Sequence, residues 1–174
     1  VEVPERTLSD LRARIRNTRW PSASPEPGWA QGTELEYLRE LLEYWADGFD
    51  WHAQERRLNE HPQFVADGIH FVHVKRGGTP LILTHGWPST FVQMLEVIPL
   101  LTDPAAHGLP NAPSFHVVAA SLPGFGFSDV PARPGVGFAT SAELMAKLMH
   151  DALGYERYGV RGSDLGGVIV RQMA

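Results

Sequence analysis

Asp164 lies at the centre of the segment Gly162-Ser163-Asp164-Leu165-Gly166, which could supply a carboxylate nucleophile. The segment follows a short apolar run and precedes a helical pattern, so its centre falls at a turn from strand to helix. Such a turn strains its central residue and needs small residues two positions before and two after it, because bulkier neighbours would block it. A centre at Ser163 would put an arginine and a leucine at those two positions, so the spacing favours Asp164.

The expected place of Asp164 also suits this chemistry. At the N-terminus of a helix, free backbone N–H groups and the helix dipole favour the ionised carboxylate, which is the form that attacks an electrophile. An aspartate that only caps the helix is common at the same position. The segment alone leaves both interpretations open.

A second motif, His85-Gly86-Trp87-Pro88, follows another apolar run and also precedes a helical pattern. Gly86 lets the backbone approach a bound group, and Pro88 fixes the turn, so the N–H of Trp87 can point into the site. Together with the N–H of Leu165 it would form an oxyanion hole. We expect His85 to hold this loop rather than to exchange protons. Taken alone, the motif could be an ordinary strand-to-helix turn.

No combination of residues predicts a metal or a cofactor. The eight histidines include no pair at metal-ligand spacing on an expected helix or strand. The glycines of the segment 124–126 lack the third glycine of a dinucleotide fingerprint. The absence of cysteine excludes disulfides, thiolate zinc sites and cysteine nucleophiles. The four tyrosines are expected to be packing residues. One carboxylate with backbone donors therefore remains as the candidate site.

Composition indicates a globular chain that binds neither nucleic acid nor membranes. The 174 residues correspond to one domain or part of one. Lys and Arg number 15 against 20 Asp and Glu, and the net charge of −5 argues against polyanionic partners. Hydrophobic residues make up 43%, yet no run approaches the roughly 18 apolar residues of a membrane span. We expect a cytoplasmic protein.

Residues 1–62 are expected to form a helical extension. Two capping boxes, Thr7 with Asp10 and Thr33 with Glu36, predict the starts of two helices. Apolar residues then recur at helical spacing until Trp20-Pro21 stops the first helix and Gly48 stops the second. A loop rich in proline and glycine separates the two. Asp50 could cap a third, short helix that runs to about residue 58.

Residues 63–174 have the pattern of an α/β core. Two strands joined by a tight Asp67-Gly68 turn come first. Short apolar strands then alternate with helical patterns, which indicates a parallel sheet covered on both faces and entered through an antiparallel hairpin. The expected strands lie at 81–85, 115–120 and 158–162, and the expected helices at 90–101, 141–153 and 165–174.

No further strand follows the last expected helix, so the strand before that helix would be an open parallel edge of the sheet. Such an edge promotes aggregation. We therefore expect the chain to be the front part of a larger fold. That fold would be completed by residues that follow Ala174 or by a second polypeptide.

Four stretches of the sequence resemble the epoxide hydrolases of the α/β-hydrolase fold, and in particular the microsomal and juvenile-hormone type with a long N-terminal extension. The resemblance rests on GWAQGTELEYLRELLEYWADGFDW with the following HPQF, on HGWPST, on SLPGFGFS at 121–128, and on GSDLGG. These stretches occur in the right order over nearly the whole chain. One departure is Leu165, since many members of the family carry tryptophan directly after the nucleophile.

The resemblance implies a mechanism and a substrate class. Asp164 would attack a carbon of a small-molecule epoxide and form an ester, and a histidine-activated water would hydrolyse that ester to a diol. The backbone donors at Trp87 and Leu165 would stabilise the oxyanion. The family takes two cap tyrosines, a late histidine and its acidic partner from residues that would lie beyond Ala174, so the chain alone is expected to be inactive. Detoxification, carbon-source use and natural-product biosynthesis all stay open as biological roles.

Two other functions stay open beside epoxide hydrolysis. Haloalkane and haloacid dehalogenases resemble this chain in fold and in their aspartate nucleophile, but their halide site draws on an aromatic or cationic residue directly after it. Leu165 offers only its backbone donor at that position. A non-catalytic binding protein of the same fold is the alternative from outside the enzymes, and the intact motifs around Asp164 and Trp87 argue against it.

Overall fold

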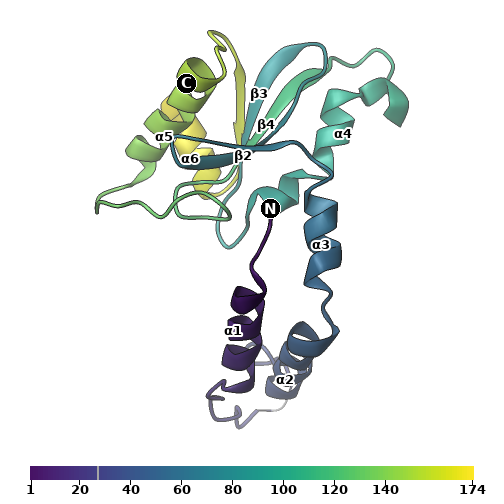
Figure 1. Ribbon diagram of the computed structural model, residues 1–174, viewed down its shortest axis with the longest axis vertical. Helices are drawn as coiled ribbons and strands as arrows, with labels where there is room; N and C mark the ends of the chain where they lie inside the picture. The colour runs from purple at the N-terminus through teal and green to yellow at the C-terminus, as the bar shows by residue number, and fades with distance from the viewer. Residues whose placement is uncertain (27) are drawn as a thin grey trace. The chain divides into compact units, whose positions relative to one another are not determined.

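A computed structural model describes residues 1–26 and 28–174, and the chain divides into two compact units, residues 1–58 and 59–174 (Figure 1). The division falls four residues before the boundary expected from the sequence. Among the described residues, no helix combines the length and the apolar character that crossing a bilayer requires.

The first unit is helical, as expected. It contains α1 (Glu5–Arg16), α2 (Leu35–Glu43) with a π-helical turn η1 (Tyr44–Gly48), and α3 (Trp51–Leu58). The prediction that Asp50 caps the third helix is confirmed, since its Oδ1 accepts a hydrogen bond from the N–H of Ala53 at 2.9 Å.

The two predicted capping boxes are wrong. Helix α1 begins at Glu5 after Pro4, because the fixed φ of proline suits the residue that precedes a helix, and this start puts Thr7 inside the first turn. Helix α2 is capped by Glu34, whose carboxylate accepts the N–H of Tyr37 at 2.7 Å. A longer acidic side chain has taken the role expected of Thr33.

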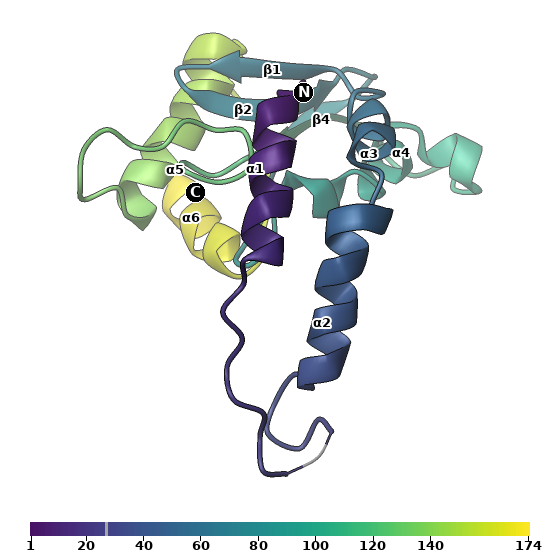
Figure 2. The same cartoon turned by 60° about the horizontal axis from the view of Figure 1, so that its bottom comes forward.

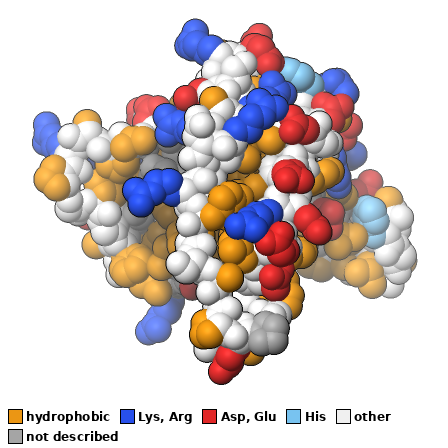
Figure 3. Space-filling model, turned by 90° about the horizontal axis from the view of Figure 1, so that it is seen from below, with side chains coloured by type: hydrophobic (Ala, Val, Ile, Leu, Met, Phe, Trp, Pro, Cys, Tyr) orange, Lys and Arg blue, Asp and Glu red, His pale blue; other side chains and the backbone are white. Residues whose placement is uncertain are grey.

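Several exposed ion pairs lie on the surface of the first unit. Arg14 pairs with Asp10 at 2.8 Å one turn away in α1, and Arg16 pairs with Asp47 of η1 at 2.6 Å. Figure 3 looks at the molecule from below and shows acidic and basic side chains beside one another with hydrophobic side chains between them. Exposed pairs of this kind contribute little to stability, typically below about 1 kcal/mol each.

The second unit is built on one mixed five-stranded sheet, ordered β1-β2-β4-β3-β5. The strands are β1 (Gln63–Ala66), β2 (Ile69–Val74), β3 (Thr79–Thr84), β4 (Phe115–Ala120) and β5 (Gly159–Gly162). Strands β1, β2 and β4 pair antiparallel, whereas β3 pairs parallel with both β4 and β5. The predicted hairpin is confirmed: Asp67 and Gly68 have φ of +48° and +76°, which is the conformation that this turn requires.

Helices cover both faces of this sheet. Helix α5 (Phe138–Lys147), extended by the π-helical turn η4 (Leu148–Ala152), lies beside α6 (Leu165–Met173) on one face, and α4 (Val97–Thr102) lies on the other (Figure 1, Figure 2). The core between the sheet and α5 and α6 holds Ile82, Val118, Met145, Met149 and Ile169, all at most 2% exposed. The predicted α/β class is therefore confirmed.

The helix expected at 90–101 is interrupted. A 3-10 turn, η2 (Phe91–Met94), precedes α4, which ends at Thr102 and is followed by another 3-10 turn, η3 (Pro104–His107). Pro99 explains the interruption, because it has no N–H to donate and its ring would clash with the carbonyl of residue 95 in a continuous helix. In α4 it stands in the first turn, where neither effect costs anything.

Candidate active site

Asp164 occupies the turn between β5 and α6 in a strained conformation. Its φ and ψ are +52° and −125°, and among the described non-glycine residues only Asp67 of the hairpin also has a positive φ. A residue other than glycine held in such a region typically costs about 1–3 kcal/mol. The surrounding contacts must therefore impose this conformation.

Three glycines allow those contacts. A Cβ on Gly162 would lie 2.3 Å from the carbonyl oxygen of Gly166, and one on Gly166 would lie 2.5 Å from the carbonyl oxygens of Thr84 and His85. A Cβ on Gly86 would lie 2.5 Å from the Cβ of Asp164. Any side chain at these positions would push the start of α6 away from the loop that follows β3. The sequence motifs are thus brought into direct contact through their glycines.

Backbone N–H groups of both motifs stabilise the charged carboxylate of Asp164. The N–H of Trp87 donates to its Oδ1 at 2.9 Å, and the backbone N–H of Leu165 also favours the ionised form. These two donors, Trp87 first, hold the pKa of Asp164 below its ordinary value, because they stabilise the charged form. The side chain caps the helix through no N–H further along α6. The carboxylate is therefore ionised, open to solvent and held through one oxygen.

His85 is fully buried behind this carboxylate and has both ring nitrogens in use. Its Nε2 accepts the N–H of Leu122 at 3.1 Å, so the ring proton must sit on Nδ1, which donates to the carbonyl of Gly86 at 2.9 Å. Burial lowers the pKa of His85 and keeps the ring neutral. Pro88 follows through a cis peptide bond after Trp87.

An apolar cavity of about 260 Å³ begins at Leu165, the residue directly after Asp164. Phe125 also lines it and packs edge-on against the ring of His85, with ring centroids 5.4 Å apart. Ser141 contributes the only hydroxyl of its lining. The other lining residues are Leu122, Pro123, Pro131, Val136, Gly137, Phe138 and Ile169.

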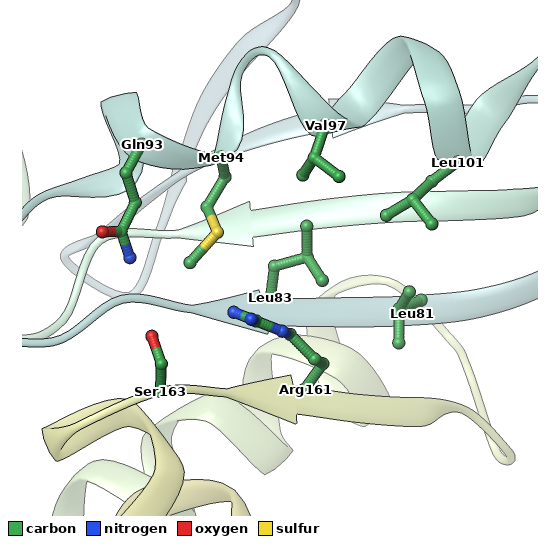
Figure 4. A pocket seen from close by; sticks show the side chains of 8 residues that line it. All are labelled: Leu81, Leu83, Gln93, Met94, Val97, Leu101, Arg161 and Ser163. Atoms are coloured by element: carbon green, nitrogen blue, oxygen red, sulfur yellow. The ribbon is translucent and has the colours of Figure 1, made fainter. Parts of the chain in front are cut away.

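A second cavity, of about 390 Å³, lies on the α4 side of the sheet (Figure 4). Its floor is apolar, from Leu81 and Leu83, and α4 closes one side. Ser163 and the side chain of Arg161 come from the other side, from β5 and the turn after it. Ser163, rejected as a nucleophile from the spacing, thus faces a different cavity from the one at Leu165.

The remaining buried histidines make structural contacts. His70 Nδ1 lies 2.9 Å from Ser121 Oγ, and its Nε2 lies 2.8 Å from Gln63 Oε1. His73 Nε2 lies 3.0 Å from the hydroxyl of Tyr155. Their placement on opposite faces of one strand was expected, but these partners were not. Within the described part of the chain, no histidine hydrogen-bonds Asp164, and no three His, Cys, Asp or Glu side chains gather as metal ligands could.

Comparison with known families gives two matches that together span the chain. The family described as epoxide hydrolase N terminus matches residues 1–94, and the alpha/beta hydrolase fold family matches residues 79–174. A relative from Stigmatella aurantiaca is 41% identical over 181 residues, and Epoxide hydrolase 1 of Sus scrofa is 35% identical over 185. Both alignments cover all of this chain but only 41% and 40% of those proteins.

Solved structures agree with this match. The juvenile hormone epoxide hydrolase of the silkworm Bombyx mori superposes with a TM-score of 0.87 at 32% identity, over 99% of this chain and 42% of that one. The Aspergillus niger epoxide hydrolase gives a TM-score of 0.82 at 32% identity, over 98% of this chain and 46% of that one. The chain thus spans less than half the length of these relatives.

Proposed function

The chain belongs to the epoxide hydrolase family, and on that premise we propose that it supplies the nucleophile and the oxyanion hole for opening an epoxide to a vicinal diol. The observation that carries the proposal is the carboxylate of Asp164, which is ionised and held at Oδ1 by the backbone N–H of Trp87. Such a group can attack with its other oxygen while its orientation stays fixed.

In the first step, Oδ2 of Asp164 attacks one carbon of the epoxide. A C–O bond of the ring breaks, and an ester forms between the carboxyl group and the substrate. The ring oxygen leaves as an alkoxide and needs a proton from an acid. Oδ1, which accepts the N–H of Trp87 at 2.9 Å, becomes the carbonyl oxygen of the ester.

In the second step, water adds to the ester carbon. The electron pair of the carbonyl moves onto Oδ1, which accepts the N–H of Trp87 and which the N–H of Leu165 would also stabilise. The ester C–O bond then breaks, and the diol leaves while the carboxylate is restored. Losing one such donor typically costs about 3 kcal/mol in the barrier, because the negative charge develops at that atom.

We further propose that a C-terminal part, on the same chain or on a second polypeptide, supplies the acid for the first step and the base for the second. This proposal is supported by the edge of the sheet, since β5 pairs with β3 and with no further strand in the described residues. The cavity over Leu81 and Leu83, with Arg161 at its side, lies next to that edge and offers an apolar surface for such a part.

We infer the substrate class from the cavity at Leu165, which adjoins the nucleophile in sequence although Asp164 itself does not line it. Its lining is apolar apart from one hydroxyl, so it favours small-molecule epoxides with an apolar substituent over charged ones. A dehalogenase is less well supported, because Leu165 presents an aliphatic side chain where a halide would need a further donor.

The proposal can be tested by joining residues 1–174 to the C-terminal part of the Stigmatella relative and assaying diol formation and halide release. We expect diol from an apolar epoxide, no halide from chloroalkanes, and no turnover in an Asp164→Asn variant that stays folded. Halide release would support the dehalogenase, and no turnover of either substrate class by the folded protein would support the binding protein.

A further inference from the structure

Two peptide groups near Asp164 are each held at both ends by hydrogen bonds. The peptide between Gly86 and Trp87 accepts from His85 Nδ1 at its carbonyl and donates to Asp164 through its N–H, both at 2.9 Å. The peptide between Ser121 and Leu122 accepts from Ser128 Oγ at its carbonyl, at 2.8 Å, and donates to His85 Nε2 at 3.1 Å. His85 is therefore the link between the two peptides.

The links can be followed one step further into the sheet. Ser128 Oγ itself accepts the N–H of His70, in β2, at 3.0 Å. Its hydroxyl proton is then the one given to the carbonyl of Ser121, since that carbonyl can only accept. Five consecutive hydrogen bonds thus lead from the backbone of β2 to the carboxylate of Asp164.

All five bonds donate in the same direction. Each donor lies on the β2 side and each acceptor on the Asp164 side, and this order fixes His85 as the neutral tautomer with its proton on Nδ1. An uncharged ring with the proton on Nε2 would face the N–H of Leu122 with another donor. A protonated ring would do the same, and burial works against that form.

The bonds also lie where they can polarise one another. His70, Ser121, His85 and Ser128 are at most 8% exposed, so water does not screen the first four hydrogen bonds. In a low-dielectric interior, aligned hydrogen bonds strengthen each other by about 10–30% per bond. The last hydrogen bond, from the exposed Trp87 to the carboxylate of Asp164, is open to solvent.

We propose that His70, Ser128 and His85 form a one-way hydrogen-bond relay that polarises and orients the N–H of Trp87 toward Asp164 Oδ1. In this relay His85 and Ser128 are positioning residues, which act on the reaction through the Gly86–Trp87 peptide without touching substrate. The catalytic value of the relay rests on the proposed function of Asp164. The relay itself can be tested without turnover, so its failure and the failure of the proposed function are distinguishable.

The first test is the tautomer of His85 in the wild-type chain, read from the ¹⁵N shifts of its ring. The relay requires a proton on Nδ1 and a bare Nε2 at neutral pH. A ring with the proton on Nε2, or a ring with both protons, would overturn the proposal, because the N–H of Leu122 would then have no acceptor there.

The second test is Ser128→Ala, which removes a hydroxyl three hydrogen bonds away from the Gly86–Trp87 peptide. We expect the downfield displacement of the Trp87 amide proton to fall by about 10–30%, the size of the lost cooperativity. The pKa of Asp164, followed by ¹³C NMR, should rise toward its ordinary value.

Ser121→Ala is the matched control. It also removes a buried hydroxyl from the same loop, and that hydroxyl contacts His70 Nδ1 outside the relay. Ser121→Ala should leave the chemical shift of the Trp87 amide proton unchanged. Equal changes in the chemical shift of the Trp87 amide proton in both variants would overturn the relay, because they would indicate general loosening of the loop. A Ser128→Ala variant that changes the amide shift of Leu122 and not that of Trp87 would overturn it as well.

Discussion

Gly166 and Gly167 are adjacent in α6 and should respond in opposite ways to the same substitution. A Cβ at Gly166 would lie 2.5 Å from two backbone carbonyl oxygens of the β3 strand end, whereas the nearest atom to a Cβ at Gly167 would be 3.5 Å away. Backbone oxygens cannot move aside as the tip of a side chain can. Gly166→Ala must therefore displace the start of α6, and Gly167→Ala needs no displacement.

The size of the difference follows from two effects. Alanine in place of glycine favours a helix by up to about 1 kcal/mol, and this gain is common to both variants. Overpacking costs about 1–3 kcal/mol and applies to Gly166→Ala alone. We expect Gly167→Ala to raise the free energy of unfolding above that of the wild-type chain. The free energy of unfolding of Gly166→Ala should be about 1–3 kcal/mol lower than that of Gly167→Ala.

Urea denaturation of the two variants beside the wild-type chain measures this difference, and the Trp87 amide proton reports on the site in the same samples. In Gly166→Ala the amide should lose its downfield shift, because Asp164 moves away from Trp87. Equal stabilities with an unchanged amide in both variants would refute the argument that close approach at Gly166 imposes the conformation of Asp164.

Three further predictions concern acid stability, strain and substrate range. Burial lowers the pKa of His70 and of His73 to about 4, so both stay neutral in the folded chain while the unfolded chain binds protons near pH 6.5. The contribution of each histidine to the free energy of unfolding is then fully present above pH 6.5 and is lost as the pH falls toward 4, by about 2 kcal/mol per histidine between pH 7 and pH 5. A free energy of unfolding from urea denaturation that does not change over that range would contradict this. Asp164→Gly should raise the urea midpoint, because glycine tolerates the positive φ, and a lower midpoint would mean that the site is unstrained. Leu165→Trp in the completed protein should lower kcat/KM for bulky epoxides about tenfold relative to small ones, and an unchanged ratio would place the substrate elsewhere.

Local patterns predicted the parts of the fold that depend on neighbours in sequence. Asp67 and Gly68 marked a hairpin because few residues accept positive φ, and the spacing around Asp164 marked a strained turn for the same reason. The helix expected at 90–101 is interrupted because Pro99 cannot stand in the interior of a continuous helix. The capping boxes failed because Pro4 and Glu34 could also begin a helix.

The contacts behind the site could not be predicted in this way. The bond from Leu122 to His85 joins residues 37 positions apart, and the bond from His70 to Ser128 joins residues 58 positions apart. Half of their partners are backbone groups, which carry no sequence signal. The serines of the SLPGFGFS stretch were the only visible clue, since small polar residues beside a buried strand often hydrogen-bond backbone.

The proposed mechanism requires Asp164 to form a covalent ester, and a single turnover in ¹⁸O-labelled water tests this most directly. With the completed protein in excess over an apolar epoxide, mass spectrometry of the peptide that contains Asp164 should find one ¹⁸O in its carboxyl group, because water attacks the ester carbon. Label found in the diol and not in Asp164 would mean that water attacks the epoxide directly, and the proposed mechanism would be wrong.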